Sequence, residues 1–124
     1  MLGACATLAV AGGARLLDAV TVHGAARDVA ALFAVARDRA MASGQRSAVR
    51  LDVAHQRVIV HAGSDTVARL DLGTARAVRL TATRDSMAYL TNGLGYGAAN
   101  LRITLSRGAA EDTITVSRLG RVAR

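Results

Sequence analysis

The amino-acid sequence predicts an α+β fold in which one long N-terminal helix packs on a small antiparallel β-domain of about seven strands. Two periodicities support this prediction. Apolar residues recur every three or four positions before residue 43 and every second position after residue 46. Ser43 and Gly44 separate the two patterns, and a glycine directly after a periodic segment commonly ends a helix. We therefore place the end of the helix at these two residues.

One apolar stripe identifies the side of the helix that faces the core. Six residues follow spacings of 4, 3, 4, 3 and 4, the pattern of one helix face, and they are Val22, Ala26, Val29, Phe33, Ala36 and Ala40. Charged residues such as Arg27 and Asp38 fall off this stripe. Because a sheet with one apolar face needs a cover, we expect the stripe to pack on the β-domain.

The segment before this stripe has nothing in the chain to cover it. Residues 1–14 carry no charge, and the first basic residue is Arg15, whereas a secretory signal begins with basic residues. A helix from Leu2 to Ala42 would be about 60 Å long at 1.5 Å per residue, too long for so small a domain to cover. We therefore divide the chain into an apolar half-helix, residues 1–19, and a globular domain, residues 20–124. The globular domain has a helix over 20–43 and an antiparallel sheet over 46–122.

Alternating apolar and polar residues after Arg46 indicate short strands. Turn residues separate them, including Gly63-Ser64-Asp65 and Asn92-Gly93. Sequential short strands with one apolar face are typical of an antiparallel sheet. The expected strands contain Val49–Val53, Val58–Val60, Ala68–Leu72, Val78–Ala82, Met87–Leu90, Leu101–Leu105 and Ile114–Val116.

The net charge of the chain indicates which classes of partner it can attract. All sixteen basic residues are Arg, and nine acidic residues leave a net charge of +7. Such a field favours polyanions, acidic protein surfaces or anionic lipid head groups. The alternative interpretation is compositional drift in an Arg-rich proteome. The single cysteine, Cys5, excludes an intrachain disulfide and a cysteine-based zinc site.

The sequence contains no recognisable catalytic, cofactor-binding or metal-ligating constellation. His23, His55 and His61 lack a ligand spacing, and we interpret them as surface residues. Residues 93–98 contain G-x-G-x-x-A, but a strand pattern follows where a dinucleotide site needs a helix N-terminus. We therefore expect no enzyme and no cofactor, and we interpret this segment as a loop between strands.

The C-terminus is a candidate nucleic-acid-binding tail. Arg118, Arg121 and Arg124 fall within the last seven residues. An exposed basic tail can neutralise phosphates and bind with a salt-dependent affinity. The alternative interpretation is a solvated final strand.

Taken in order, these features resemble the GspH/FimT group of type IV pilin-like proteins, the minor pseudopilins and minor pilins. The segment Ala36-Arg37-Asp38-Arg39-Ala40-Met41-Ala42-Ser43-Gly44 is similar to the a-R-x-x-A-x-x-x-G pattern that ends the helix in this family. The segment from Ile114 to Val122 is similar to the closing strand with its v-S-x-x-G-R ending. The resemblance covers nearly the whole chain.

This resemblance implies a pilin-like fold and a structural subunit of a type II secretion system or type IV pilus-like machine. Such a subunit is anchored in the bacterial inner membrane, with its globular domain in the periplasm, until it is assembled into a fibre. Residues 1–19 would then lie first in the membrane and later in the fibre core. The implied partners are other pseudopilins or pilins and the inner membrane.

Two departures from the family's pattern bear on these implications. The basic leader and the G-F-T-L-I-E segment that prepilin peptidase cleaves are missing. Either this copy has lost processing or the true N-terminus lies upstream of Met1, and the abrupt apolar start favours the upstream N-terminus. Some relatives bind DNA through a G-R-x-R ending, whereas here Val122 and Ala123 separate the last two arginines. A DNA-binding minor pilin for DNA uptake, acting through Arg118, Arg121 and Arg124, stays the alternative function.

Overall fold

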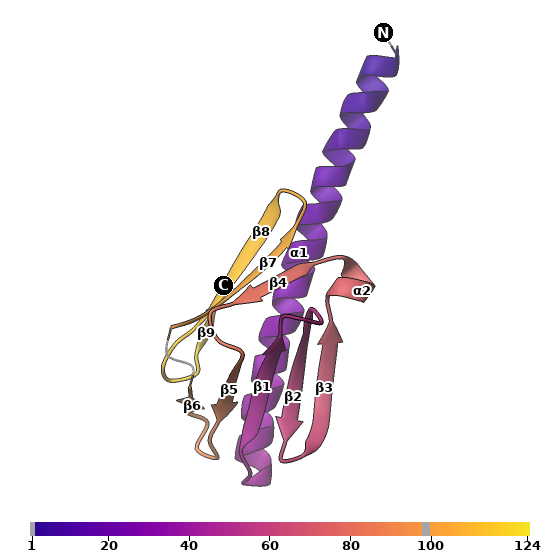
Figure 1. Ribbon diagram of the computed structural model, residues 1–124. Helices are drawn as coiled ribbons and strands as arrows, with labels where there is room; N and C mark the ends of the chain where they lie inside the picture. Colours follow the sequence, from indigo (N-terminus) through magenta and orange to yellow (C-terminus); the bar gives the residue numbers. More distant parts are fainter. Residues whose placement is uncertain (1, 98–99) are drawn as a thin grey trace.

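A single helix forms the axis of the molecule. The computed structural model describes residues 2–97 and 100–124, except for the side chains of residues 2–12. Helix α1 spans Leu2–Ser43, 42 residues, and extends well beyond the strands toward its N-terminus (Figure 1). It ends where the sequence predicts, because Gly44 adopts a left-handed φ of 65° that a glycine tolerates without strain.

The strands form two antiparallel sheets on one side of α1 (Figure 1). The first sheet has the order β3-β2-β1-β5-β6. Its strands are β1 Ser47–Asp52, β2 Arg57–Ala62, β3 Asp65–Asp71, β5 Ser86–Tyr89 and β6 Gly95–Tyr96. The second sheet has the order β4-β7-β8-β9. Its strands are β4 Arg79–Ala82, β7 Leu101–Arg107, β8 Ala110–Val116 and β9 Val122–Ala123. A short helix, α2 Gly73–Arg76, joins β3 to β4.

The core lies between α1 and the inner faces of both sheets. The six residues of the helix stripe, Val22, Ala26, Val29, Phe33, Ala36 and Ala40, are all completely buried. They belong to one cluster with inward-facing residues of both sheets, such as Val49 of β1 and Ile103 of β7. Because most of the helix side chains in this cluster are small, each buries little area, and the core depends on many residues packing together.

The predicted fold class is confirmed. The structure also divides the strands between two sheets, which the sequence pattern does not show. Alternation identifies the inward-facing residues of each strand but does not determine which strands pair. The chain leaves the first sheet at α2, where Ala77 has a left-handed φ of 54°. It returns with β5, which pairs with β1. Two strands of two residues each, β6 and β9, are too short to give an alternating pattern.

The segment with the G-x-G-x-x-A pattern, which the sequence analysis interprets as a loop between strands, contains the short strand β6. Asn92 and Gly93 form the turn after β5, and Gly95 begins β6. The next regular element after this segment is strand β7, not a helix, so the segment lacks the helix N-terminus that a pyrophosphate site needs.

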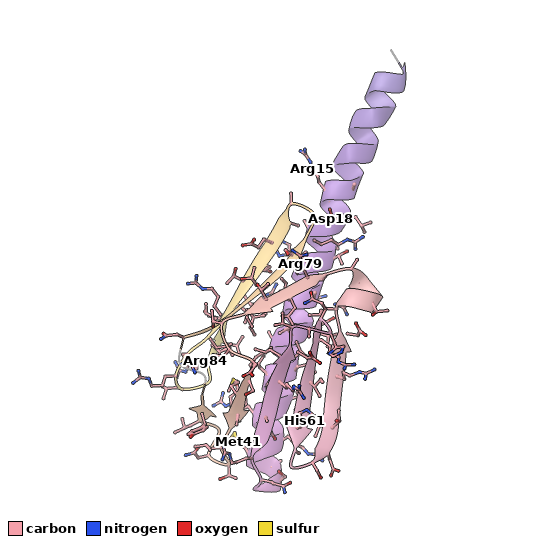
Figure 2. The ribbon with its side chains drawn as sticks, viewed as in Figure 1. Arg15, Asp18, Met41, His61, Arg79 and Arg84 are labelled. Carbon is pink, nitrogen blue, oxygen red and sulfur yellow. The ribbon has the colours of Figure 1, made fainter. Side chains whose placement is uncertain are left out.

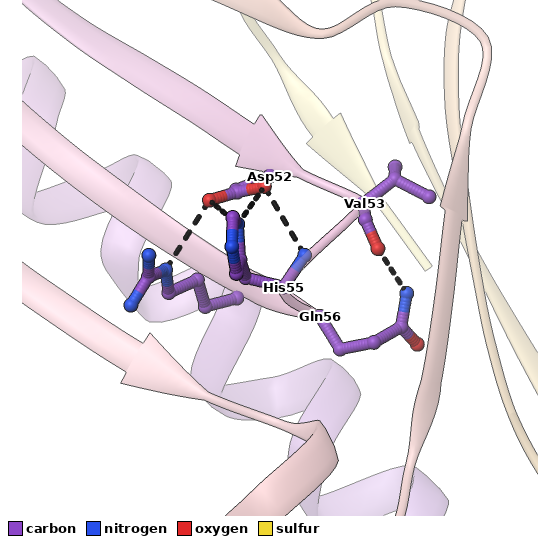
Figure 3. Close-up of polar contacts among 5 residues, drawn as sticks. Asp52, Val53, His55 and Gln56 are labelled. Carbon is purple, nitrogen blue, oxygen red and sulfur yellow. Dashed lines mark hydrogen bonds and ion pairs between the residues drawn. The ribbon is translucent and has the colours of Figure 1, made fainter.

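The β1–β2 turn contains a charged cluster on its outer side. The Asp52 carboxylate lies 3.0 Å from Nδ1 of His55 and 3.2 Å from Nε of Arg57 (Figure 3). Burial alone would raise the pKa of Asp52, but these hydrogen bonds and the backbone N–H of His55 outweigh it and lower that pKa. The carboxylate therefore stays ionised and holds the turn closed.

Gln56, in the same turn, connects the two sheets. Its side-chain amide donates to the carbonyl oxygens of Val53 at 2.6 Å (Figure 3) and Leu80 at 3.0 Å. Its Oε1 accepts the backbone N–H of Leu80 at 2.6 Å, so the amide extends the hydrogen bonding of β4. Its backbone carbonyl accepts from Leu72 and Gly73 at the start of α2. One side chain thus fixes the position where the chain changes sheets.

We predict that Gln56→Ala destabilises the protein by about 1–3 kcal/mol, because it leaves the backbone N–H and carbonyl of the fully buried Leu80 without partners. Urea denaturation followed by circular dichroism measures this change. The control is Thr81→Ala, an exposed change on the same strand, which we expect to stay within about 0.5 kcal/mol of wild type. Equal stability of the two variants would contradict the role of Gln56.

Candidate assembly surface and basic groove

The N-terminal part of α1 leaves the β-domain at Asp18. There Nε of Arg107, at the end of β7, lies 3.0 Å from the Asp18 carboxylate, and a guanidinium N–H of Arg107 donates to the Thr21 hydroxyl at 3.3 Å. Figure 2 shows Asp18 beside the β7–β8 hairpin and Arg15 beyond it. Among the described residues, this ion pair is the most N-terminal polar contact between the helix and the sheets.

Apolar side chains around this point are exposed. Leu16, Leu17 and Val20 have 66%, 56% and 61% of their surface accessible. By length and composition, the Gly13–Ser43 part of α1 could cross a membrane, but a core helix of a soluble protein meets the same criteria. The exposed leucines are the more specific observation, since exposing large aliphatic side chains costs about 1.5–3 kcal/mol each relative to burial. The side chains of residues 1–12, including Cys5, lie outside the described residues.

The three C-terminal arginines do not form one cluster. Arg118 and Arg121 line an open groove of about 480 Å³ together with Arg102 of β7. None of the described residues that line this groove is acidic. Arg124 turns away from it and contacts the Asp112 carboxylate at 3.5 Å and the backbone carbonyl of His23 at 3.3 Å. Arg102 is the residue that sequence reasoning missed, because only the β7–β8 pairing brings it to the groove.

Asp112 of β8 holds the C-terminus against the helix. Its carboxylate lies 2.8 Å from Nδ1 of His23 on α1 and also contacts Arg124. Burial alone would raise the pKa of Asp112, but hydrogen bonds with His23, Arg124 and the backbone N–H of Thr113 outweigh it and lower that pKa. Arg124 is therefore neutralised within the chain and contributes less to a basic surface than Arg118 or Arg121 does.

The three histidines do not share a contact partner among the described residues. His23 pairs with Asp112, His55 pairs with Asp52, and His61 is half-buried on β2. Within the part of the chain that the structure describes, no group of three His, Cys, Asp or Glu side chains is placed to hold a metal ion.

A tight turn determines the course of the C-terminal segment. The backbone N–H of Gly120 donates to the carbonyl of Ser117, and the Ser117 hydroxyl accepts the N–H of Arg121 at 3.1 Å. Gly120 has a φ of 85°, and a Cβ there would lie 2.6 Å from the Tyr89 ring. The closing S-x-x-G-R sequence therefore forms a turn that directs Arg118 and Arg121 toward the groove.

Tyr89 and Gly95 connect this turn to the first sheet. The hydroxyl of buried Tyr89 donates to the Gly120 carbonyl at 2.7 Å, and the N–H of Gly95 donates to the Leu119 carbonyl at 3.1 Å. A Cβ at Gly95 would lie 2.8 Å from the Gly120 backbone. Burial raises the pKa of Tyr89 to about 12, against the opposing positive charge of Arg37. The hydroxyl thus stays protonated and donates the bond at physiological pH.

We predict that Gly120→Ala destabilises the protein by about 2 kcal/mol more than Gly97→Ala, measured by denaturant unfolding. Both glycines have a positive φ, 85° and 74°, but a Cβ at Gly97 meets nothing within 4 Å. The difference between the variants therefore reports the close contacts of position 120 with the Tyr89 ring and the Gly95 backbone. Tyr89→Phe, which removes the bond to the Gly120 carbonyl, should cost about 1 kcal/mol. A Gly120 variant as stable as the Gly97 variant would show that the close approach is not required.

Comparisons with known proteins agree with the fold. The family described as Type II transport protein GspH matches residues 25–120. The fold is similar to that of the minor pilin FimU of Pseudomonas aeruginosa, with a TM-score of 0.68 at 12% identity over 82% of this chain and 86% of that one. It is also similar to the minor pseudopilin EpsH from the type II secretion system of Vibrio cholerae, with a TM-score of 0.64 at 15% identity over 82% and 94% of the two chains. No curated protein sequence matches the chain.

Proposed function

Because the chain belongs to the GspH family of type II transport proteins, we propose that it is a structural minor pseudopilin or pilin subunit. In this proposal it serves a type II secretion system or a type IV pilus-like machine. It is first anchored in the bacterial inner membrane, with residues 20–124 in the periplasm, and is then assembled into a fibre with other pseudopilins or pilins. Residues 1–19 pass from the membrane into the fibre core.

The observation that carries this proposal is the uncovered part of α1. The β-domain stops contacting the helix near Asp18, yet Leu16 and Leu17 lie exposed beside that point. A soluble protein would bury or replace such residues, whereas a bilayer or neighbouring helices would cover them. The Asp18–Arg107 ion pair then lies at the border between the membrane and the aqueous phase.

The double variant Leu16→Asp/Leu17→Asp tests the anchor. We expect the share of protein retained in alkali-washed membranes to fall several-fold, since an acidic residue costs up to about 3 kcal/mol in an apolar membrane segment. The matched control is Leu94→Asp/Leu119→Asp, which changes two leucines on the β-domain that are 43% and 56% exposed. The control should remain with the membranes.

All four substituted positions are exposed, so neither double variant should change the melting temperature by more than a few degrees. Release of the wild-type chain by alkali, or equal retention of both variants, would contradict the anchor.

The basic groove supports a second candidate function, DNA binding for DNA uptake. Arg102, Arg118 and Arg121 lie on one open surface without an acidic neighbour among the described residues that line it. Three arginines in such an arrangement can contact successive phosphates of a polynucleotide. Arg124, which the sequence places in the same tail, is paired with Asp112.

We predict that Arg118→Ala/Arg121→Ala weakens binding of a DNA duplex about tenfold or more and lowers the slope of log affinity against log salt by about two. Fluorescence anisotropy at two salt concentrations measures both quantities. Arg124→Ala should have a smaller effect, and Arg69→Ala/Arg79→Ala, at exposed positions on β3 and β4, controls for net charge. The groove has no role in DNA binding if the two double variants behave alike.

A further inference from the structure

The outer face of the first sheet contains an open hollow. Helix α1 packs on the inner face of this sheet, so the outer face points away from the helix (Figure 1). The hollow has a volume of about 490 Å³ and lies beside the start of β1. Its floor consists of the small side chains of Ala48 and Ala88, which lie opposite each other on β1 and β5.

A ring stands on either side of this floor. Strand pairing places His61 of β2 next to Ala48, and Tyr96 of β6 next to Ala88. Because residues paired across antiparallel strands lie on the same face, these four residues form one row across the sheet. Neighbouring strands are about 4.8 Å apart, so the imidazole and the phenol ring are attached about 14 Å apart, with only two methyl groups between them.

Arginines stand at the other two sides of the hollow. Arg46 directly precedes β1, and its guanidinium lies 5.0 Å from the centre of the Tyr96 ring, which places it on the outer face. Arg50 lies four residues further along the chain and alternates to the same face. Within residues 2–97 and 100–124, neither arginine has an ion-pair partner. A cation–π contact uses no hydrogen-bond acceptor, so the N–H donors of Arg46 stay available to a ligand.

The charges around the hollow favour a short anionic ligand. None of the described residues that line it is acidic, and cations with neutral donors attract carboxylates or phosphates. The row beyond Arg50 has the opposite balance, because Asp52, Arg57 and Asp71 lie side by side on the outer face. Hydrogen bonds lower the pKa of Asp52, so its carboxylate stays ionised. A long polyanion running along β1 would meet these carboxylates, whereas a short acidic segment would not.

We propose that this hollow binds an extended acidic segment of a partner protein. Arg46 and Arg50 are about 13 Å apart at 3.3 Å per residue, and an extended peptide places its residues i and i+4 at the same distance on one side. Each guanidinium can pair with a carboxylate through two parallel N–H···O bonds. The side chain of residue i+2 then packs over Ala48 and Ala88, between the two rings.

The segment belongs to another protein, because this chain has no two acidic residues four positions apart. The hollow lies on the opposite side of the first sheet from α1, so binding there does not depend on what covers the helix. The inference therefore goes beyond the proposed anchor and subunit role, and it concerns a different surface from the basic groove of the second sheet.

Fluorescence anisotropy with the full chain in an uncharged detergent and the labelled peptide S-E-S-V-S-E-S tests the proposal. Binding should be saturable, and Arg46→Ala/Arg50→Ala should weaken it at least tenfold. The matched control is Arg118→Ala/Arg121→Ala, which removes the same charge from the basic groove and should weaken binding less than twofold. All four arginines are exposed, so neither variant should change the melting temperature by more than a few degrees.

Two further measurements separate shape from net charge. The peptide S-S-E-V-E-S-S has the same composition, but its carboxylates are two residues apart, and it should bind at least fivefold more weakly because it reaches one arginine at a time. Ala88→Leu fills the hollow and keeps both arginines, and it should weaken binding of the first peptide at least fivefold. Equal affinity for the two peptides, or an Ala88 variant that binds as wild type does, would overturn the proposal.

A polynucleotide is the competing ligand, and a single-stranded DNA oligonucleotide tests it in the same assay. If Arg46→Ala/Arg50→Ala lowers the DNA affinity tenfold while neither peptide binds the wild-type chain, the hollow is a nucleic-acid site and the proposal is wrong. A folded wild-type chain that shows no saturable binding of the first peptide would also overturn it. Neither result would affect the proposed anchor, which the membrane-retention variants test separately.

Discussion

Both sheets depend on the same apolar stripe of α1, because each has one face that only the helix can cover. Val22 through Ala40 supply completely buried side chains along five turns, and strands of both sheets contact them. Hydrogen bonds of Gln56, Tyr89 and Gly95 also connect the two sheets. A substitution within the stripe therefore weakens the packing of both sheets on the helix. A substitution that removes one of these hydrogen bonds affects only the place where it joins the two sheets.

The sequence predicts the parts of the fold that follow from periodicity. Spacings of three and four identify the inner helix face, alternation identifies the inward positions of the long strands, and Gly44 marks the end of the helix. Strand pairing was not predictable, because it depends on local geometry without a periodic signal. The chain passes between the sheets at the left-handed backbone of Ala77 and beside the amide of Gln56, and neither residue type is specific for such a role.

The arginines of the candidate groove were likewise only partly predictable from the sequence. Arg118 and Arg121 were predicted from their positions in the chain, and the Ser117–Gly120 turn brings them together. Arg124 is separated from them because Asp112 lies opposite in the folded chain, and Arg102 joins them through strand pairing. Proximity in sequence therefore identifies a basic region, but tertiary contacts decide which of its charges stay available to a phosphate.

The composition of α1 also accounts for its division between two roles. The surface of α1 differs along its length: the stripe from Val22 to Ala40 is buried against the β-domain, whereas Leu16, Leu17 and Val20 are exposed before it. Such contacts gain little from each side chain and need close approach over a long distance, which a 42-residue helix provides. The Asp18–Arg107 ion pair limits how far the β-domain extends along this helix. In the proposed function, the residues beyond it contact partners, so the stability of the domain and the assembly of the subunit would depend on different residues of one helix.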